Sequence, residues 1–195
     1  MDGFHRTLGI IEAIQQNPEL KYITGVYITN FDVNKAHRLI VQEDKKNKIN
    51  RKYIKTLDLD NCSNKIATKL NEDSRSYLSG KISILKNSIV DYVVLSEAIS
   101  YEFAPKETVD VVKYSKYLID GINYIFELKP EFLAEKQVNT VWIAIIALLK
   151  KVYNAKDWKL QINKTIKKIN FGQFKEEKNV NRSVVKSVSG IINQL

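Results

Sequence analysis

Apolar residues recur at helical intervals through most of the chain, and the pattern is clearest in the second half. The spacing predicts helices over residues 107–127, 136–153, 158–169 and 181–193, and a helical pattern from about Val90 onward. Gly and Pro are scarce, with 7 and 3 residues, which also favours helices. The longest apolar run, VWIAIIALL, is far shorter than the roughly 20 residues of a membrane span, so it predicts a buried helix.

The expected helix over 107–127 has one broad apolar face that should point into the core. We place on this face Val109, Val112, Leu118, Ile119, Ile122 and Phe126. Trp142 and Trp158 lie on predicted amphipathic helices, so we expect both rings to be buried or half-buried.

The first half of the chain mixes helical and extended patterns. A helix is expected over 5–16, and YITGVYIT, residues 22–29, is rich in β-forming residues and predicts a strand. Further helices are expected over 32–44 and 61–72, and GKISIL at 80–85 is a second candidate strand. The fold class expected is therefore mainly α with a small β component (α+β). We expect a division into portions 1–80 and 81–195 that pack as one unit.

Charge is large and unevenly spread. The net charge is +9, which suits a polyanionic partner such as DNA, although a genome rich in Lys, Asn and Ile codons would also raise it. Residues 32–55 hold eight Lys/Arg against three acids, and residues 150–186 hold eleven against three. Residues 91–135 are acidic, with nine acids against four bases. If the two basic segments meet in space, they form one basic face; otherwise they are solvated helix surfaces.

Cysteine and histidine usage limits the chemistry. Cys62 is the one cysteine, so no disulfide framework is expected and a reducing cytoplasmic location fits. One Cys and two His cannot make an ordinary Cys/His zinc site, and we expect no metal. An apolar leader segment is missing at the N-terminus, and we expect no membrane partner.

The stretch Asp2-Gly3-Phe4-His5-Arg6 stands at the start of the first predicted helix. The N-terminus of a helix offers unpaired N–H groups and partial positive charge, and Gly3 would let an anion approach the backbone. Arg6 can clamp a phosphate and His5 can move a proton, while Asp2 can cap the helix or bind a ribose hydroxyl. By spacing alone the signal is weak, and an ordinary Asp cap with a surface His and Arg is the favoured explanation.

Residues 2–8, DGFHRTL, resemble the signature of the DGQHR-domain family, relatives of the DndB regulator associated with DNA phosphorothioation and more distantly of the ParB/sulfiredoxin-like fold. The resemblance covers roughly residues 2–75, with 22–28 as the family's strand and 47–54 as its polar stretch. Phe4 replaces the family's usual Gln. Family members carry strands before the motif, where this sequence has Met1. The resemblance therefore implies a truncated DGQHR/ParB-like α/β portion followed by a helical C-terminal portion.

Several weaker patterns favour structural roles. Ser79-Gly80-Lys81 is similar to the end of a phosphate loop, but Arg75 stands where that loop needs Gly. Cys62 and His37 have nothing in the sequence that would orient them as a nucleophile and base. Four acids around the ends of the helix expected over 61–72 are interpreted as solvated caps: Asp58, Asp60, Glu72 and Asp73.

Three functions follow from these observations. The first is a non-enzymatic, DNA-associated regulator or phage or mobile-element accessory protein, resembling DndB. Its phosphate contacts would be Lys45, Lys46, Lys48, Arg51, Lys52, Lys164, Lys167 and Lys168. The second is a ParB-like enzyme that binds a nucleotide through Asp2, Gly3, His5 and Arg6. The third is a protein-interaction module with a phage or defence role. No resident cofactor is expected beyond the nucleotide of the second function.

Overall fold

The computed structural model describes residues 11–17, 32, 35, 37–38, 58, 60–85, 88–134, 137–177 and 180–195. The chain groups into two compact units, Met1–Asp32 and Val33–Leu195. In the first unit residues 11–16 are helical, as their pattern predicts, with Ile11 and Ile14 exposed. The predicted strand at 22–29 lies outside the described residues.

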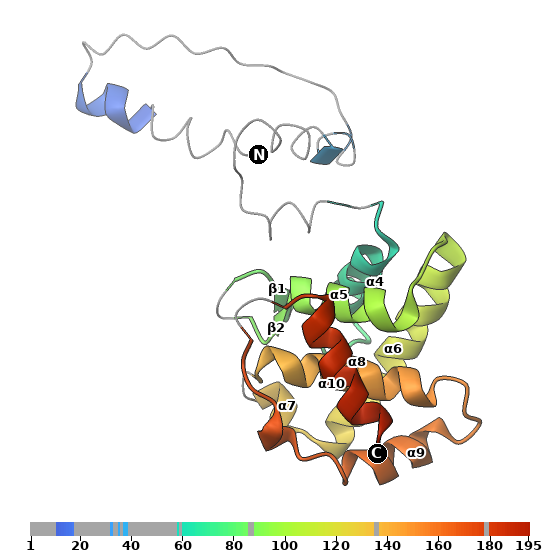
Figure 1. Cartoon of the computed structure of the whole chain (residues 1–195). Coiled ribbons are helices and arrows are strands. Elements are labelled where there is room, and N and C mark those ends of the chain that lie inside the picture. The colour runs from blue at the N-terminus through green and yellow to red at the C-terminus, as the bar shows by residue number, and fades with distance from the viewer. Residues whose placement is uncertain are drawn as a thin grey trace. The chain divides into compact units, whose positions relative to one another are not determined.

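In the part that the structure describes, the second unit is built from helices with one small sheet (Figure 1). Its elements are α4 Cys62–Glu72, β1 Ile82–Ser83, β2 Val90–Asp91, α5 Tyr92–Phe103, α6 Thr108–Leu128, α7 Glu131–Ala134, α8 Asn139–Val152, α9 Trp158–Ile166, the 3-10 turn η1 Phe171–Gln173 and α10 Arg182–Asn193. The strands β1 and β2 are parallel, with Ile82 opposite Val90. The mainly α fold class with a small β component is confirmed, and so is a strand at Ile82, but β2 was not predicted.

Short polar side chains set where the helices begin. Asn61 accepts hydrogen bonds from the N–H groups at the start of α4, Asp91 does so for α5, and Asn181 for α10. Each of these caps satisfies donors that a helix leaves unpaired in its first turn. At the end of α5, Ala104 adopts a left-handed conformation with φ 42° and turns the chain toward α6.

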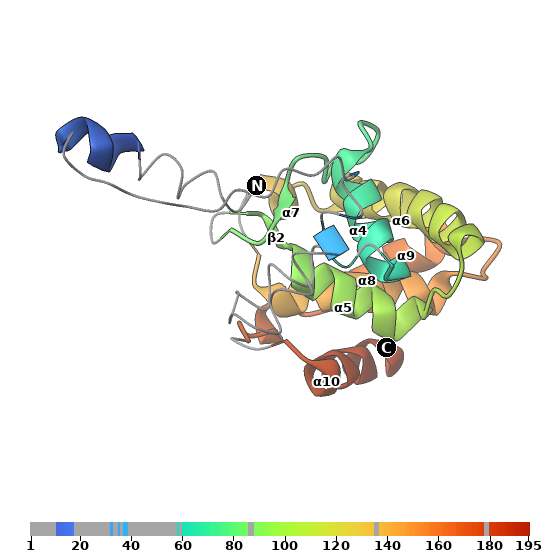
Figure 2. The same cartoon turned by 90° about the horizontal axis from the view of Figure 1, so that it is seen from above.

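Helix α8 lies at the centre of the described core. It packs against α5, α10, α9 and α6, and α4 joins the same core through α5 and α6 (Figures 1 and 2). Residues 140–149 are all buried, and Trp142 is 1% exposed. The prediction of a central buried helix is therefore confirmed. None of the helices in the described ranges is long and apolar enough to cross a membrane.

The side chain of Leu149 in α8 packs against Gly121 of α6. A Cβ atom added to Gly121 would lie 2.5 Å from Cδ2 of the buried Leu149 side chain. Carbon atoms do not approach so closely, so a side chain at position 121 would require that methyl group of Leu149 to move within the packed core.

The predicted apolar face of α6 is wrong in its first turns. Leu118, Ile119, Ile122 and Phe126 are buried as predicted, but Val109 is 72% exposed and Val112 is 57% exposed. The helix buries an arc centred on Val111, Ser115, Leu118, Ile122 and Ile125 instead. Each residue turns the helix by about 100°, which places Val109 opposite that arc and Val112 just beyond its edge.

Candidate functional site

Most of the residues predicted to contact a ligand lie outside the described residues. These are Asp2, Gly3, His5, Arg6, Lys45, Lys46, Lys48, Arg51 and Lys52. Lys164, Lys167 and Lys168 are described, at and just beyond the end of α9.

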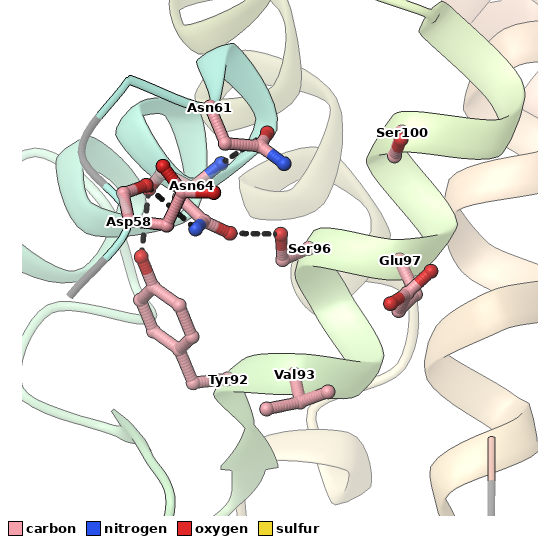
Figure 3. Close-up of a pocket in the computed structure, with 8 residues that line it drawn as sticks. All are labelled: Asp58, Asn61, Asn64, Tyr92, Val93, Ser96, Glu97 and Ser100. Atoms are coloured by element: carbon pink, nitrogen blue, oxygen red, sulfur yellow. Dashed lines mark hydrogen bonds between the residues drawn. The ribbon is translucent and has the colours of Figure 1, made fainter. Parts of the chain in front are cut away.

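A small polar cleft of about 160 Å³ opens between α4 and α5 (Figure 3). Its lining is almost entirely polar and consists of Asp58, Asn61, Asn64, Tyr92, Val93, Ser96, Glu97 and Ser100. Within the described ranges no group of three His, Cys, Asp or Glu side chains is placed to hold a metal ion.

The floor of this cleft is a hydrogen-bonded joint centred on Asn64, which is 4% exposed. Its Nδ2 donates to the carbonyl oxygen of Asp58 at 2.8 Å, and its Oδ1 accepts from the hydroxyl of Ser96. Tyr92 donates its hydroxyl to the carbonyl oxygen of Asn64 at 2.9 Å (Figure 3). Buried polar groups that are mutually paired hold elements together, so these contacts fix α4 against α5.

Burial raises the pKa of Tyr92, and the nearby carboxylates of Glu72 and Asp58 raise it further, although a hydrogen bond to Thr68 lowers it. The hydroxyl therefore stays protonated at neutral pH and remains a donor to Asn64. The polar groups of Asn64, Tyr92 and Ser96 in the cleft are therefore explained by the hydrogen bonds that hold α4 against α5.

Two of the four acids interpreted as caps form ion pairs on the surface. Asn61 caps α4, and Asp60 pairs with Arg38 at 3.2 Å on the exposed surface. Asp73 pairs with Arg75 at 2.6 Å, and the hydrogen bonds from Arg75 lower the pKa of Asp73 to about 2. These contacts lie on the surface, so they support the interpretation of the acids as solvated groups.

Lys164, Lys167 and Lys168 gather at the C-terminal end of α9. All three are exposed, while Ile162 and Ile166 turn the opposite side of the helix into the core. None of the three forms an ion pair with a carboxylate in the part of the chain that the structure describes. The C-terminal end of a helix carries partial negative charge, which favours lysines there. The three lysines therefore do not destabilise α9 when no ligand is bound.

A second lysine-bearing surface follows α6, the end of α8 and the start of α9. We call it the aromatic–lysine surface and define it by Tyr114, Tyr117, Tyr124, Tyr153, Trp158, Lys113, Lys150 and Lys159. Tyr117 packs edge-on against Tyr153 with ring centroids 4.8 Å apart, and against Trp158 at 5.8 Å. These aromatic rings form a string. Tyr114 extends it at one end, with its ring centroid 5.5 Å from that of Tyr153, and Tyr124 extends it at the other end, with its ring centroid 6.0 Å from that of Trp158.

The three lysines of this surface lie over its rings. The Nζ of Lys113 is 5.3 Å from the ring centroid of Tyr153, and the Nζ of Lys150 is 5.7 Å from the same centroid. The Nζ of Lys159 is 5.2 Å from the centroid of Tyr124. Such a cation–π contact is worth about 0.5–1 kcal/mol at an exposed site, so it positions an ammonium group without fixing it.

The sequence analysis did not find the aromatic–lysine surface. Its one local signal is the spacing of Tyr114, Tyr117 and Tyr124, which brings three rings to one side of α6. Tyr153 and Trp158 join them only because α6 packs against α9 and the end of α8. All five rings are half-buried.

Comparisons with known proteins give one distant similarity. No family model matches the chain, and no solved structure matches it. The chain is 25% identical over 130 residues to the SPbeta prophage-derived uncharacterized protein YopQ of Bacillus subtilis (strain 168), a match that covers 60% of this chain. The chain spans only 28% of the length of that relative.

Proposed function

We propose that this protein is a DNA-associated, non-enzymatic accessory protein of a phage or mobile element. The observation that carries the proposal is the cluster of Lys164, Lys167 and Lys168, which projects three cations from one helix end with no ion pair to a described carboxylate. Lysines in such a position can neutralise adjacent DNA phosphates and release the counterions bound to them.

The charge of the whole chain supports the same function. A net charge of +9 attracts a polyanion from a distance, and it is concentrated in two segments. In this proposal the segment with Lys45, Lys46, Lys48, Arg51 and Lys52 adds further phosphate contacts. Contacts of this kind position a protein on DNA without reading its sequence.

Two similarities support the proposed setting. The DGFHRTL stretch resembles the signature of DGQHR-domain proteins, whose DndB relatives are regulators associated with DNA modification. The similar protein from Bacillus subtilis is described as prophage-derived. Together they favour a regulatory or accessory role at the DNA of a mobile element.

The proposal is tested by fluorescence anisotropy with a labelled random-sequence duplex over about 50 to 200 mM salt. The triple variant Lys164→Ala/Lys167→Ala/Lys168→Ala is compared with a control that loses the same charge elsewhere, Lys69→Ala/Lys116→Ala/Lys186→Ala. We expect the slope of log affinity against log salt to become shallower by ~3 in the first variant, with a much smaller change in the control.

A second variant, Lys48→Ala/Arg51→Ala/Lys52→Ala, tests the other basic segment in the same assay, and weaker, less salt-dependent binding is expected. The proposal is wrong if the wild-type protein does not bind duplex DNA at low salt. It is also wrong if its affinity does not depend on salt.

A further inference from the structure

We propose that the aromatic–lysine surface is a binding site for single-stranded nucleic acid. In this site Lys113, Lys150 and Lys159 bind the phosphates, and the rings of Tyr124 and Trp158 stack against bases. The inference rests on the proposed function in one respect, namely that the protein associates with nucleic acid. It adds a second binding site and a preference for single-stranded over double-stranded nucleic acid.

The lysines are placed for an anion. The Nζ atoms of Lys113 and Lys150 lie 5.3 Å and 5.7 Å from the centroid of the same Tyr153 ring, so both positive charges are placed around one aromatic side chain. Neither forms an ion pair with a carboxylate in the described ranges. The nearest acid along α6, Asp110, already accepts hydrogen bonds from the N–H groups of Lys106 and Glu107. A phosphate group bound near Tyr153 would be attracted by both cations.

The rings are placed for a base. Tyr124 and Trp158 pack nearly perpendicular to each other, with an interplanar angle of 80°, and both are half-buried. Lys159 lies over both rings, with Nζ 5.2 Å from the centroid of Tyr124 and 5.6 Å from that of Trp158. Lysine has a long flexible stem, so the ammonium group can move to a phosphate and leave a ring face to a base.

A single strand matches this combination better than the alternatives. Its unpaired bases offer flat faces beside each phosphate, and base–aromatic stacking accepts any base. A duplex keeps its bases stacked within the helix and would use the lysines alone. An acidic peptide would also use the lysines but brings no base to the rings.

Tryptophan fluorescence provides a direct test, because Trp142 is buried in the core and Trp158 is the tryptophan at the site. The full chain is titrated with oligo-dT, with a hairpin duplex and with poly-glutamate. We expect oligo-dT to quench the emission and to bind more tightly than either competitor. In Trp158→Phe the quenching should disappear, while binding followed by anisotropy of labelled oligo-dT should be weakened.

Charge variants test the lysines at this site. Lys150→Gln/Lys159→Gln removes both charges and keeps the first part of each aliphatic stem, and we expect it to weaken oligo-dT binding about tenfold. The control Lys69→Gln/Lys186→Gln loses the same charge away from the rings and should change the affinity by less than about twofold. Circular dichroism of each variant shows whether it is folded.

The outcomes separate this inference from the proposed function. Tight, salt-dependent binding of the duplex with no preference for oligo-dT overturns the single-strand site and leaves the proposed function standing. Equal binding of poly-glutamate and oligo-dT overturns the site in favour of a protein partner. If neither the duplex nor oligo-dT binds, both proposals are wrong.

Discussion

Tyr117 joins α6 to the open end of α8. Its hydroxyl donates to the carbonyl oxygen of Leu149 at 2.7 Å. That carbonyl lies in the last turn of α8, where helices leave acceptors unpaired, and the N–H of Tyr153 donates to Lys150 instead. Burial raises the pKa of Tyr117, and the charge of an ionised Tyr153 raises it further. A tyrosinate could not donate to Leu149, so the contact depends on the proton.

This contact predicts sensitivity to alkaline conditions. The pKa of Tyr117 in the folded state lies above its value in the unfolded chain, which is near 10. The stabilisation that the protonated Tyr117 hydroxyl gives to the folded state is therefore complete below about pH 10, and it is lost as the pH rises through the folded-state pKa. We expect the unfolding free energy to fall above about pH 10. Tyr117→Phe should lower it by about 1 kcal/mol at neutral pH and make the alkaline fall shallower. Burial also raises the pKa of Tyr92, so some of the fall should remain.

Urea denaturation followed by circular dichroism between about pH 7 and 11 measures both effects. Tyr114→Phe is the control, because it removes a hydroxyl from the same string of rings, and the Tyr114 hydroxyl makes no hydrogen bond to another described residue. Identical pH profiles for the two variants would rule out a special role for Tyr117.

Sequence alone could predict the environment of some residues but not their partners. Trp142 is buried and Trp158 half-buried, as the amphipathic patterns predict. Val109 and Val112 are apolar residues in a helical pattern, yet they are exposed, because they lie outside the arc of α6 that packs against the described core. The hydroxyl of Tyr117 bonds to Leu149, and the amide oxygen of Asn64 bonds to Ser96, each 32 residues away in the sequence. No local pattern in the sequence indicates such pairs.

At the scale of helices, two glycines have opposite expected effects. Gly121 lies where α6 crosses α8, and an added Cβ would meet Leu149 at 2.5 Å, whereas at Gly190 in α10 nothing lies within 4 Å. Alanine favours a helix over glycine by about 1 kcal/mol, but overpacking a core costs typically 1–3 kcal/mol. We therefore expect Gly121→Ala to be neutral or destabilising and Gly190→Ala to stabilise the fold by about 0.5–1 kcal/mol.

Thermal denaturation of the two variants beside the wild type measures the difference, since both carry the same chemical change. A stabilising Gly121→Ala would show that the Leu149 side chain moves aside at little cost. Gly121→Val, with a larger side chain, should destabilise more than Gly121→Ala if the close crossing is correct.

The helices themselves were largely predictable. The expected segments at 61–72, 107–127, 136–153 and 181–193 each contain or nearly match a helix of the structure. The strand β2 was missed because its two residues continue directly into α5, so its apolar Val90 merges with the helical pattern. The aromatic–lysine surface needs three elements to pack together, and periodicity along one segment cannot predict such packing.

At the scale of the molecule, every residue of the described core lies between Ile66 and Ile192. This predicts that a fragment of residues 58–195 folds cooperatively on its own. We expect a helical circular dichroism spectrum and a single unfolding transition in urea. The fragment also lacks Lys45–Lys52, so it allows the two basic segments to be assayed separately.

A shorter fragment, residues 58–180, is the matched test because it lacks α10. It loses the three buried apolar side chains of α10, Val185, Val188 and Ile192, and uncovers the surface of α8 and α5 beneath them. We expect its transition to broaden or vanish. A broad, non-cooperative transition in the 58–195 fragment itself would show that the core needs residues before 58.

The position of α10 also determines when this fold can form during protein synthesis. Helix α8 leaves the ribosome well before residues 182–193 do, and those residues supply the cover for its apolar side. A nascent chain that has reached only the segment between α9 and α10 therefore carries an unfinished core with exposed hydrophobic surface, the condition that recruits chaperones or leads to aggregation. Folding of this unit is completed only after its last helix has been translated.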